Sequence, residues 1–197
     1  MTTYDALIFD CDGTLADTMP LHYRAWSLAA DKFGFHFSED RFYSLGGVPV
    51  HTIVEMLVTE AGIATMVHEV VAYKEAAYLR CLDRVVPVEP VLAIAREHRG
   101  RLPMAVASGS TREMVERTLQ QLGILDWFEC LVAAEDTERH KPEPDVFLEA
   151  ARRLQVVPTR CCVYEDTDTG LTAARQAGMA CVDIRQMHTP ERQTRPK

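Results

Sequence analysis

The chain has 197 residues, 47% hydrophobic and 25% charged, which is enough length and apolar content for a globular protein with its own core. A formal net charge of −8 disfavours binding to nucleic acid or to an anionic membrane, because both need a positively charged surface. The N-terminus lacks the basic and then apolar opening of a secretory signal, and no apolar run approaches the roughly 20 residues of a membrane span.

Five short apolar runs, each followed by polar residues, predict strands. They are Ala6 to Phe9, Met104 to Ala107, Leu131 to Ala133, Cys161 to Tyr164 and Ala180 to Ile184. Helical patterns between the last four runs cover Arg112 to Leu122, Pro144 to Leu154 and Thr169 to Gln176. Near-continuous apolar strands that alternate with helices are typical of a parallel sheet covered on both faces. The sequence therefore predicts an α/β fold with a Rossmann-like, doubly wound parallel sheet.

The segment from residue 17 to residue 86 breaks this alternation, because it carries only helical periodicity. Its exit, "VPVEP" from Val86, contains two prolines that would stop a helix and stiffen a connector. We expect three parts: an inserted small helical cap over residues 17–86, a Rossmann-like core formed by residues 1–16 and 87–188, and a polar tail over residues 189–197.

Reactive polar residues follow four of the strand runs. In chain order they are Asp10 and Asp12, then Ser108, then Lys141, then Glu165 and Asp166. Each has an ordinary structural reading: a turn serine, a solvated lysine, a pair that caps a helix. Ligand sites of open parallel sheets lie beyond the carboxyl ends of the strands, and the repetition at this one edge favours a functional site.

The four carboxylates would repel one another at a few ångströms unless a cation lay among them. Oxygen ligands without paired His or Cys favour Mg²⁺, which also binds phosphate. Lys141 could supply a fixed positive charge, while Ser108 and the backbone N–H groups of its turn could bind phosphoryl oxygens. The sequence contains neither G-x-x-x-x-G-K-[ST] nor G-x-G-x-x-G, which disfavours a nucleoside triphosphate or dinucleotide fold.

These residues resemble, in order and spacing, the four motifs of the haloacid dehalogenase superfamily over nearly the whole chain: "DCDGT" from Asp10, Ser108, Lys141-Pro142 and "EDT" from Glu165. The resemblance implies that Asp10 attacks phosphorus to form an aspartyl-phosphate. It implies that Asp12 is the general acid and base, and the presence of Asp12 favours phosphoryl transfer over dehalogenation. Cys11, between them on an extended segment, would point away as a buried structural thiol.

The remaining roles implied by the resemblance concern phosphate and metal. Ser108 and Lys141 would hold the phosphoryl oxygens. Magnesium would be bound by Asp166 together with Glu165, Asp10 and the main-chain carbonyl of Asp12.

The cap resembles that of the β-phosphoglucomutase-like branch of the superfamily. His22 and Lys74 fall where that branch has cap residues that meet the sugar phosphate and gate proton transfer, although a helix-end histidine and a solvated lysine are the structural alternatives. The loop "LGGVPVHTI" from Leu45 lacks the arginine with which the mutase grips its second phosphate. This difference disfavours a mutase cycle.

That loop, "GRLPMAV" from Gly100 and "HKPEPDVFL" from His140 are similar to enterobacterial sugar phosphatases that act on fructose 1-phosphate and 6-phosphogluconate. We therefore expect a Mg²⁺-dependent phosphoric monoester hydrolase whose partner is a small phosphorylated sugar. A hexose-phosphate mutase of the β-phosphoglucomutase type is the enzymatic alternative. A non-catalytic sugar-phosphate sensor is the alternative from another class.

The cysteines indicate the cellular compartment in which the protein is expected. None has C-x-x-C spacing and all lie in apolar settings: Cys11, Cys81, Cys130, Cys161, Cys162 and Cys181. A chain of this size does not need disulfides. We expect reduced, mostly buried thiols in a cytoplasmic protein, and a monomer that binds neither nucleic acid nor membrane.

Overall fold

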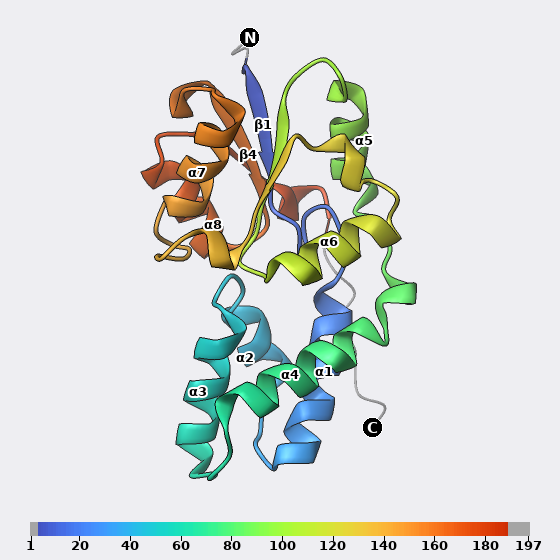
Figure 1. Cartoon of the computed structure of the whole chain (residues 1–197), viewed down its shortest axis with the longest axis vertical. Helices are drawn as coiled ribbons and strands as arrows, with labels where there is room; N and C mark the ends of the chain where they lie inside the picture. The colour runs from blue at the N-terminus through green and yellow to red at the C-terminus, as the bar shows by residue number, and fades with distance from the viewer. Residues whose placement is uncertain (1–3, 189–197) are drawn as a thin grey trace.

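A five-stranded parallel sheet lies at the centre of the computed structural model, which describes residues 4–188 (Figure 1). Its strands are β1 (Ala6–Phe9), β2 (Met104–Ala107), β3 (Cys130–Val132), β4 (Cys161–Glu165) and β5 (Ala180–Asp183). The order β3-β2-β1-β4-β5 is that of a doubly wound sheet, which confirms the predicted fold class. The predicted polar tail, residues 189–197, lies outside the described residues.

Helices cover both faces of the sheet. One face packs against α5 (Glu89–His98) and α6 (Arg112–Gln121), and the other against α7 (Asp145–Leu154) and α8 (Asp168–Gln176). Successive side chains of a strand point to opposite faces, so Leu7 and Phe9 of β1 join the first cluster and Ile8 joins the second. Each fully buried side chain of this size contributes about 1.5–3 kcal/mol.

Helix α5 was not among the predicted elements. Pro87 and Pro90 predicted a stiff connector, but Pro90 lies in the first turn of α5. A proline is compatible with that position, because the first N–H groups of a helix have no intrahelical acceptor. The Val91, Leu92 and Ala95 side chains are buried against the sheet and explain why the helix forms there.

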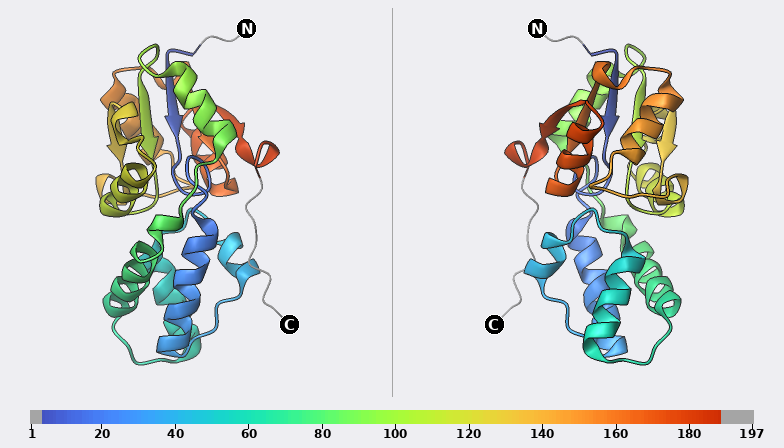
Figure 2. Two further views of the ribbon diagram at one scale, coloured as in Figure 1. Left: turned by 90° about the vertical axis from the view of Figure 1, so that its right-hand side faces the viewer. Right: turned by 90° about the vertical axis from the view of Figure 1, so that its left-hand side faces the viewer.

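Four helices form a second lobe beyond the carboxyl edge of the sheet (Figures 1 and 2). They are α1 (Met19–Phe33), α2 (Glu39–Ser44), α3 (Val50–Ala61) and α4 (Val67–Leu79). Their shared core includes the buried side chains of Trp26, Phe42 and Leu57. We call this lobe the cap. Short 3-10 helices complete the described chain: Leu82–Arg84, Leu125–Trp127, Ala134–Asp136, Pro158–Arg160 and Ile184–Gln186.

The two segments that join cap and sheet run side by side. Ala16 and Pro87 form an antiparallel bridge, and the Asp17 N–H donates to the Val86 carbonyl at 2.9 Å. The predicted cap limits, residues 17 and 86, fall in this ribbon, and the division into domains remains a proposal. Away from the ribbon, the Tyr78 hydroxyl of α4 lies 2.8 Å from that of Thr118 in α6.

Two further expectations concern cysteines and membranes. Cys11, Cys81, Cys161 and Cys162 are buried, Cys130 and Cys181 are half-buried, and all six are free thiols. Within residues 4–188, no helix has both the length and the apolar character needed to cross a membrane.

Candidate active site

The ends of β1 and β4, which are neighbours in the sheet, bring three carboxylates together. Oxygens of Asp10, Glu165 and Asp166 lie within 4.8 Å of one another. Asp10 and Glu165 are buried and Asp166 is half-buried. Their positions after the predicted strands put these residues at one edge of the sheet, and the structure brings them into one cluster.

Lys141 lies against this cluster, in the loop that follows β3. Its Nζ donates to Asp10 Oδ1 at 2.7 Å, to Glu165 Oε1 at 2.7 Å and to the Ala107 carbonyl at 3.3 Å. Burial alone would lower the pKa of Lys141, but the charges of Asp10 and Glu165 outweigh burial and raise it above its usual range. Lys141 is therefore a permanent ammonium buried between two carboxylates, not a solvated lysine.

One ammonium does not neutralise three carboxylates. Burial, together with the charges of Glu165 and Asp12, raises the pKa of Asp10 to about 7 despite Lys141. Burial and the charges of Glu165 and Asp10 raise the pKa of Asp166 as well. These carboxyl groups are hard to ionise together because too little positive charge lies near them. A hard divalent cation such as Mg²⁺ would supply that charge and is bound by oxygen ligands of this kind.

Magnesium is expected to raise the midpoint of thermal unfolding, and to raise it more at about pH 8 than at about pH 5.5, because near the lower pH Asp10 holds a proton that the metal must displace. Thermal scans with Mg²⁺ and with EDTA at both pH values measure the difference. Asp166→Asn should diminish the Mg²⁺ shift. A shift of equal size at both pH values would contradict the assigned cluster.

Two glycines leave room for the acidic side chains. A Cβ on Gly13 would overlap the Asp166 carboxylate, and a Cβ on Gly170 would overlap that of Glu165. Glu165 is further held by Thr167, whose backbone N–H and hydroxyl donate to Oε2 at 2.6 and 2.9 Å. The start of α8 thus positions the carboxylate that binds Lys141.

Gly170→Ala is expected to destabilise the protein by about 1–3 kcal/mol, because the added methyl group would displace a buried carboxylate from Lys141. Helix propensity alone predicts the opposite, a gain of about 0.5–1 kcal/mol for Gly→Ala. Urea unfolding distinguishes the two signs. A variant as stable as the wild type would show that Glu165 can move without cost.

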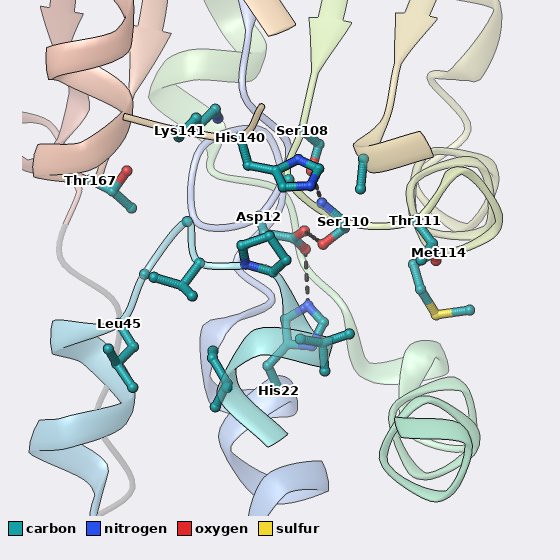
Figure 3. A pocket seen from close by; sticks show the side chains of 18 of the residues that line it. Asp12, His22, Leu45, Ser108, Ser110, Thr111, Met114, His140, Lys141 and Thr167 are labelled. Carbon is teal, nitrogen blue, oxygen red and sulfur yellow. Dashed lines mark hydrogen bonds and ion pairs between the residues drawn. The ribbon is translucent and has the colours of Figure 1, made fainter. Parts of the chain in front are cut away.

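Asp12 lies apart from the acidic cluster and faces the cap (Figure 3). Its carboxylate accepts hydrogen bonds from the Thr18 hydroxyl at 2.7 Å and the Ser110 hydroxyl at 2.6 Å, and lies 3.1 Å from His22 Nε2. Burial raises the pKa of Asp12, but His22 and the two hydroxyls outweigh burial and hold it well below its usual range. Asp12 is therefore an ionised carboxylate here, ready to accept a proton. Its main-chain carbonyl as a metal ligand remains a prediction.

His22 and Lys74, both predicted from the cap, form a buried chain with Asp12. Lys74 Nζ lies 3.1 Å from His22 Nδ1. An ammonium can only donate, so His22 accepts at Nδ1 and carries its proton at Nε2, toward Asp12. Burial and Lys74 lower the pKa of His22, and burial lowers that of Lys74 to about 8. Tyr78 stacks on the imidazole with ring centroids 4.0 Å apart and fixes its plane.

A cavity of about 320 Å³ separates the acidic cluster from the cap helices. Ser108, at the end of β2, is buried and borders the cavity beside Lys141 (Figure 3). Its Oγ accepts from the Ser110 N–H at 3.1 Å, in the turn that leads into α6. Ser108 and Lys141 thus border one end of a cavity large enough for a small ligand.

The chain matches the model of the haloacid dehalogenase-like hydrolases over residues 4–178. The chain belongs to this family. It is 39% identical to the fructose-1-phosphate phosphatase YqaB of Escherichia coli, over 92% of this chain and 97% of that protein. It is 30% identical to a phosphorylated carbohydrates phosphatase of Thermotoga maritima, over 89% and 82%. The crystal structure of a β-phosphoglucomutase from Clostridium difficile aligns with a TM-score of 0.82 at 25% identity, covering 92% of this chain and 84% of that one.

Membership of the haloacid dehalogenase-like hydrolases confirms the resemblance inferred from the four motifs, and with it that the chain is an enzyme. Enzymes of this family generally use Mg²⁺, in agreement with the oxygen cluster of Asp10, Glu165 and Asp166.

In this haloacid dehalogenase-like hydrolase, a cap loop touches the core beside the acidic cluster. The Gly46 carbonyl accepts from the Thr169 hydroxyl at 2.9 Å, and the Gly47 carbonyl lies close to Gly109. Gly47 has a φ of 82°, which favours glycine. The cap loop therefore lies against the sheet edge on this side of the cavity.

Three polar contacts of this hydrolase were not predicted from the sequence. Thr18 and Ser110 hold Asp12, and Thr167 holds Glu165. Thr18 stands at the start of α1, where a threonine usually caps the helix, yet its side chain makes no capping bond. Only Ser110 carried a local signal, as the second serine of the Ser-Gly-Ser turn.

Proposed function

We propose that this hydrolase releases phosphate from small sugar phosphates in a Mg²⁺-dependent reaction, with fructose 1-phosphate or 6-phosphogluconate as the favoured substrates. The observation that carries the proposal is that two nearby carboxylates have different surroundings. Asp10 lies against the Lys141 ammonium and the acidic cluster, whereas Asp12 faces a histidine of the cap. Relatives named as phosphatases of fructose 1-phosphate and of phosphorylated carbohydrates support a sugar phosphate as substrate.

In this proposal an Asp10 oxygen attacks phosphorus, and the bond from phosphorus to the sugar oxygen breaks as an aspartyl-phosphate forms. The departing sugar oxygen takes a proton from Asp12. Asp12 then removes a proton from water, the water oxygen attacks phosphorus, and phosphate leaves Asp10 as a free carboxylate. Ser108 and Lys141 bind the phosphoryl oxygens throughout and stabilise the charge of the transferring group.

Asp12 must be protonated for the first step, whereas in this structure its pKa is held low. His22 Nε2, 3.1 Å away, is the donor that faces it. As that proton moves to Asp12, His22 Nδ1 takes one from the Lys74 ammonium 3.1 Å away, so that the imidazole stays neutral. We propose that Asp10, Glu165, Asp166 and the Asp12 carbonyl hold Mg²⁺. Bound there, the ion would supply positive charge to neutralise the phosphoryl oxygens.

A hexose-phosphate mutase is the second candidate, favoured by the structural likeness to a β-phosphoglucomutase. A mutase must hold a second phosphate on the cap side. Among the described residues that line the cavity there is no arginine, and Pro49 and Val50 lie in the loop where the mutase has one. Hydrolysis therefore remains the favoured proposal.

The test is phosphate release from a panel of fructose 1-phosphate, 6-phosphogluconate and β-glucose 1-phosphate, with Mg²⁺ and with EDTA. Mg²⁺-dependent release of inorganic phosphate is the expected result. Conversion of β-glucose 1-phosphate into glucose 6-phosphate, with a bisphosphate activator and without free phosphate, would assign a mutase instead. Binding of these sugars without any turnover would indicate a sensor.

A further inference from the structure

One carboxylate of the cavity has no assigned role. Glu75, on α4 directly after Lys74, is half-buried and lines the cavity. It has neither a hydrogen bond nor an ion pair with any described residue, unlike the other cavity-lining carboxylates Asp10, Asp12, Glu135 and Glu165. A half-buried acceptor without a partner, in a site for a polyhydroxyl ligand, is suited to receive that ligand's hydroxyl groups.

The charges near Glu75 are of both signs, with the Lys74 ammonium opposed by the carboxylates of Glu113 and Glu135. Two ammoniums line the cavity, Lys74 and Lys141, and Lys141 is bound between Asp10 and Glu165. Glu135 is exposed, lines the cavity and accepts from the Arg112 N–H at the start of α6. Thr111 and Met114, which border the cavity along the same helix, carry no charge (Figure 3).

The pKa of Glu75 reflects its burial and these nearby charges. Burial raises its pKa above the usual value, Lys74 opposes the rise, and the negative charges of Glu113 and Glu135 add to it. Of these carboxylates, Glu75 of the cap and Glu135 of the core both line the cavity. A second anionic group of a ligand would meet repulsion there.

We propose that Glu75 is a specificity-determining residue, which accepts hydrogen bonds from the hydroxyl groups of the leaving sugar and, with Glu135, repels ligands that carry a second anionic group. The inference rests on the proposed sugar phosphatase activity and narrows its substrate class to monophosphates of neutral polyhydroxyl compounds. Of the two favoured substrates, the inference keeps fructose 1-phosphate and makes 6-phosphogluconate, a phosphorylated sugar acid, a poor one. Sugar bisphosphates are poor substrates for the same reason.

The experiment compares two pairs of substrates whose members differ by one anionic group: open-chain sorbitol 6-phosphate with 6-phosphogluconate, and fructose 1-phosphate with fructose 1,6-bisphosphate. We expect the wild type to prefer the neutral member of each pair in kcat/KM at about pH 8, by about tenfold for a charge within a few ångströms. Glu75→Gln keeps the shape and an acceptor but removes the charge, so it should shrink this preference severalfold. Glu69→Gln is the matched control, because Glu69 is exposed on the same helix and does not line the cavity.

Equal kcat/KM within both pairs in the wild type, or the same preference in the Glu75 and Glu69 variants, would overturn the inference while leaving a sugar phosphatase in place. If the protein has no phosphatase activity, calorimetry can still measure how tightly each ligand binds to the Asp10→Asn variant. Tighter binding of sorbitol 6-phosphate than of 6-phosphogluconate to this variant, with a smaller difference once Glu75→Gln is added, supports Glu75 as the discriminating group. Equal affinities for the two ligands would overturn the proposed role of Glu75, whether or not the protein turns them over.

Discussion

Asp10→Asn is expected to reduce phosphate release by about 10⁴-fold or more, because an amide cannot act as the attacking carboxylate. The fold should persist. Asn has almost the same shape, and Lys141 keeps its bonds to Glu165 and to the Ala107 carbonyl. Steady-state phosphate release gives the size of the loss, and circular dichroism with urea unfolding checks the fold.

The matched control for this substitution is Asp31→Asn, on the exposed side of α1, which removes the same charge far from the acidic cluster. It should retain wild-type turnover. Borohydride reduction during turnover should trap an acyl phosphate in the wild type and none in the Asp10 variant. Robust activity of Asp10→Asn would refute its assignment as the nucleophile.

Lys141→Met is expected to abolish turnover and to lower the free energy of unfolding by about 3–5 kcal/mol, because it removes one partner of a buried ion pair and leaves carboxylates uncompensated. The loss should be larger at about pH 8 than at about pH 5. Without the ammonium the pKa of Asp10, already raised to about 7, rises further. A carboxyl whose folded-state pKa is raised stabilises the fold below its unfolded pKa, and this stability is lost as the pH rises.

Urea unfolding at the two pH values, in EDTA, measures this difference between Lys141→Met and the wild type. Lys32→Met is the control, since Lys32 is exposed on α1 and its removal changes the net charge equally. Added Mg²⁺ should restore part of the stability lost by the Lys141 variant. A loss of stability that does not depend on pH would mean that the missing side-chain volume, and not the missing charge, destabilises the protein.

The strands and the acidic motifs were predictable because they depend on neighbours in sequence. An apolar run of four residues such as Ala6–Phe9 indicates a buried strand wherever it lies, and two aspartates separated by one residue on an extended segment fall on one side of the chain. Helix α5 was not predicted because the two prolines indicated a connector. The helix forms because it buries one face against the sheet, which the local sequence does not reveal.

What the sequence determined by itself was therefore the α/β class, the family motifs and the presence of an acidic site at one sheet edge. The tertiary structure alone decided which charges meet. Lys141 binds Asp10 across 131 residues of chain, and Lys74 reaches His22 across 52. Such contacts produce no periodic pattern in the sequence, because they depend on how distant parts of the chain pack together. The unpartnered Glu75 at the cavity wall emerges only from that packing.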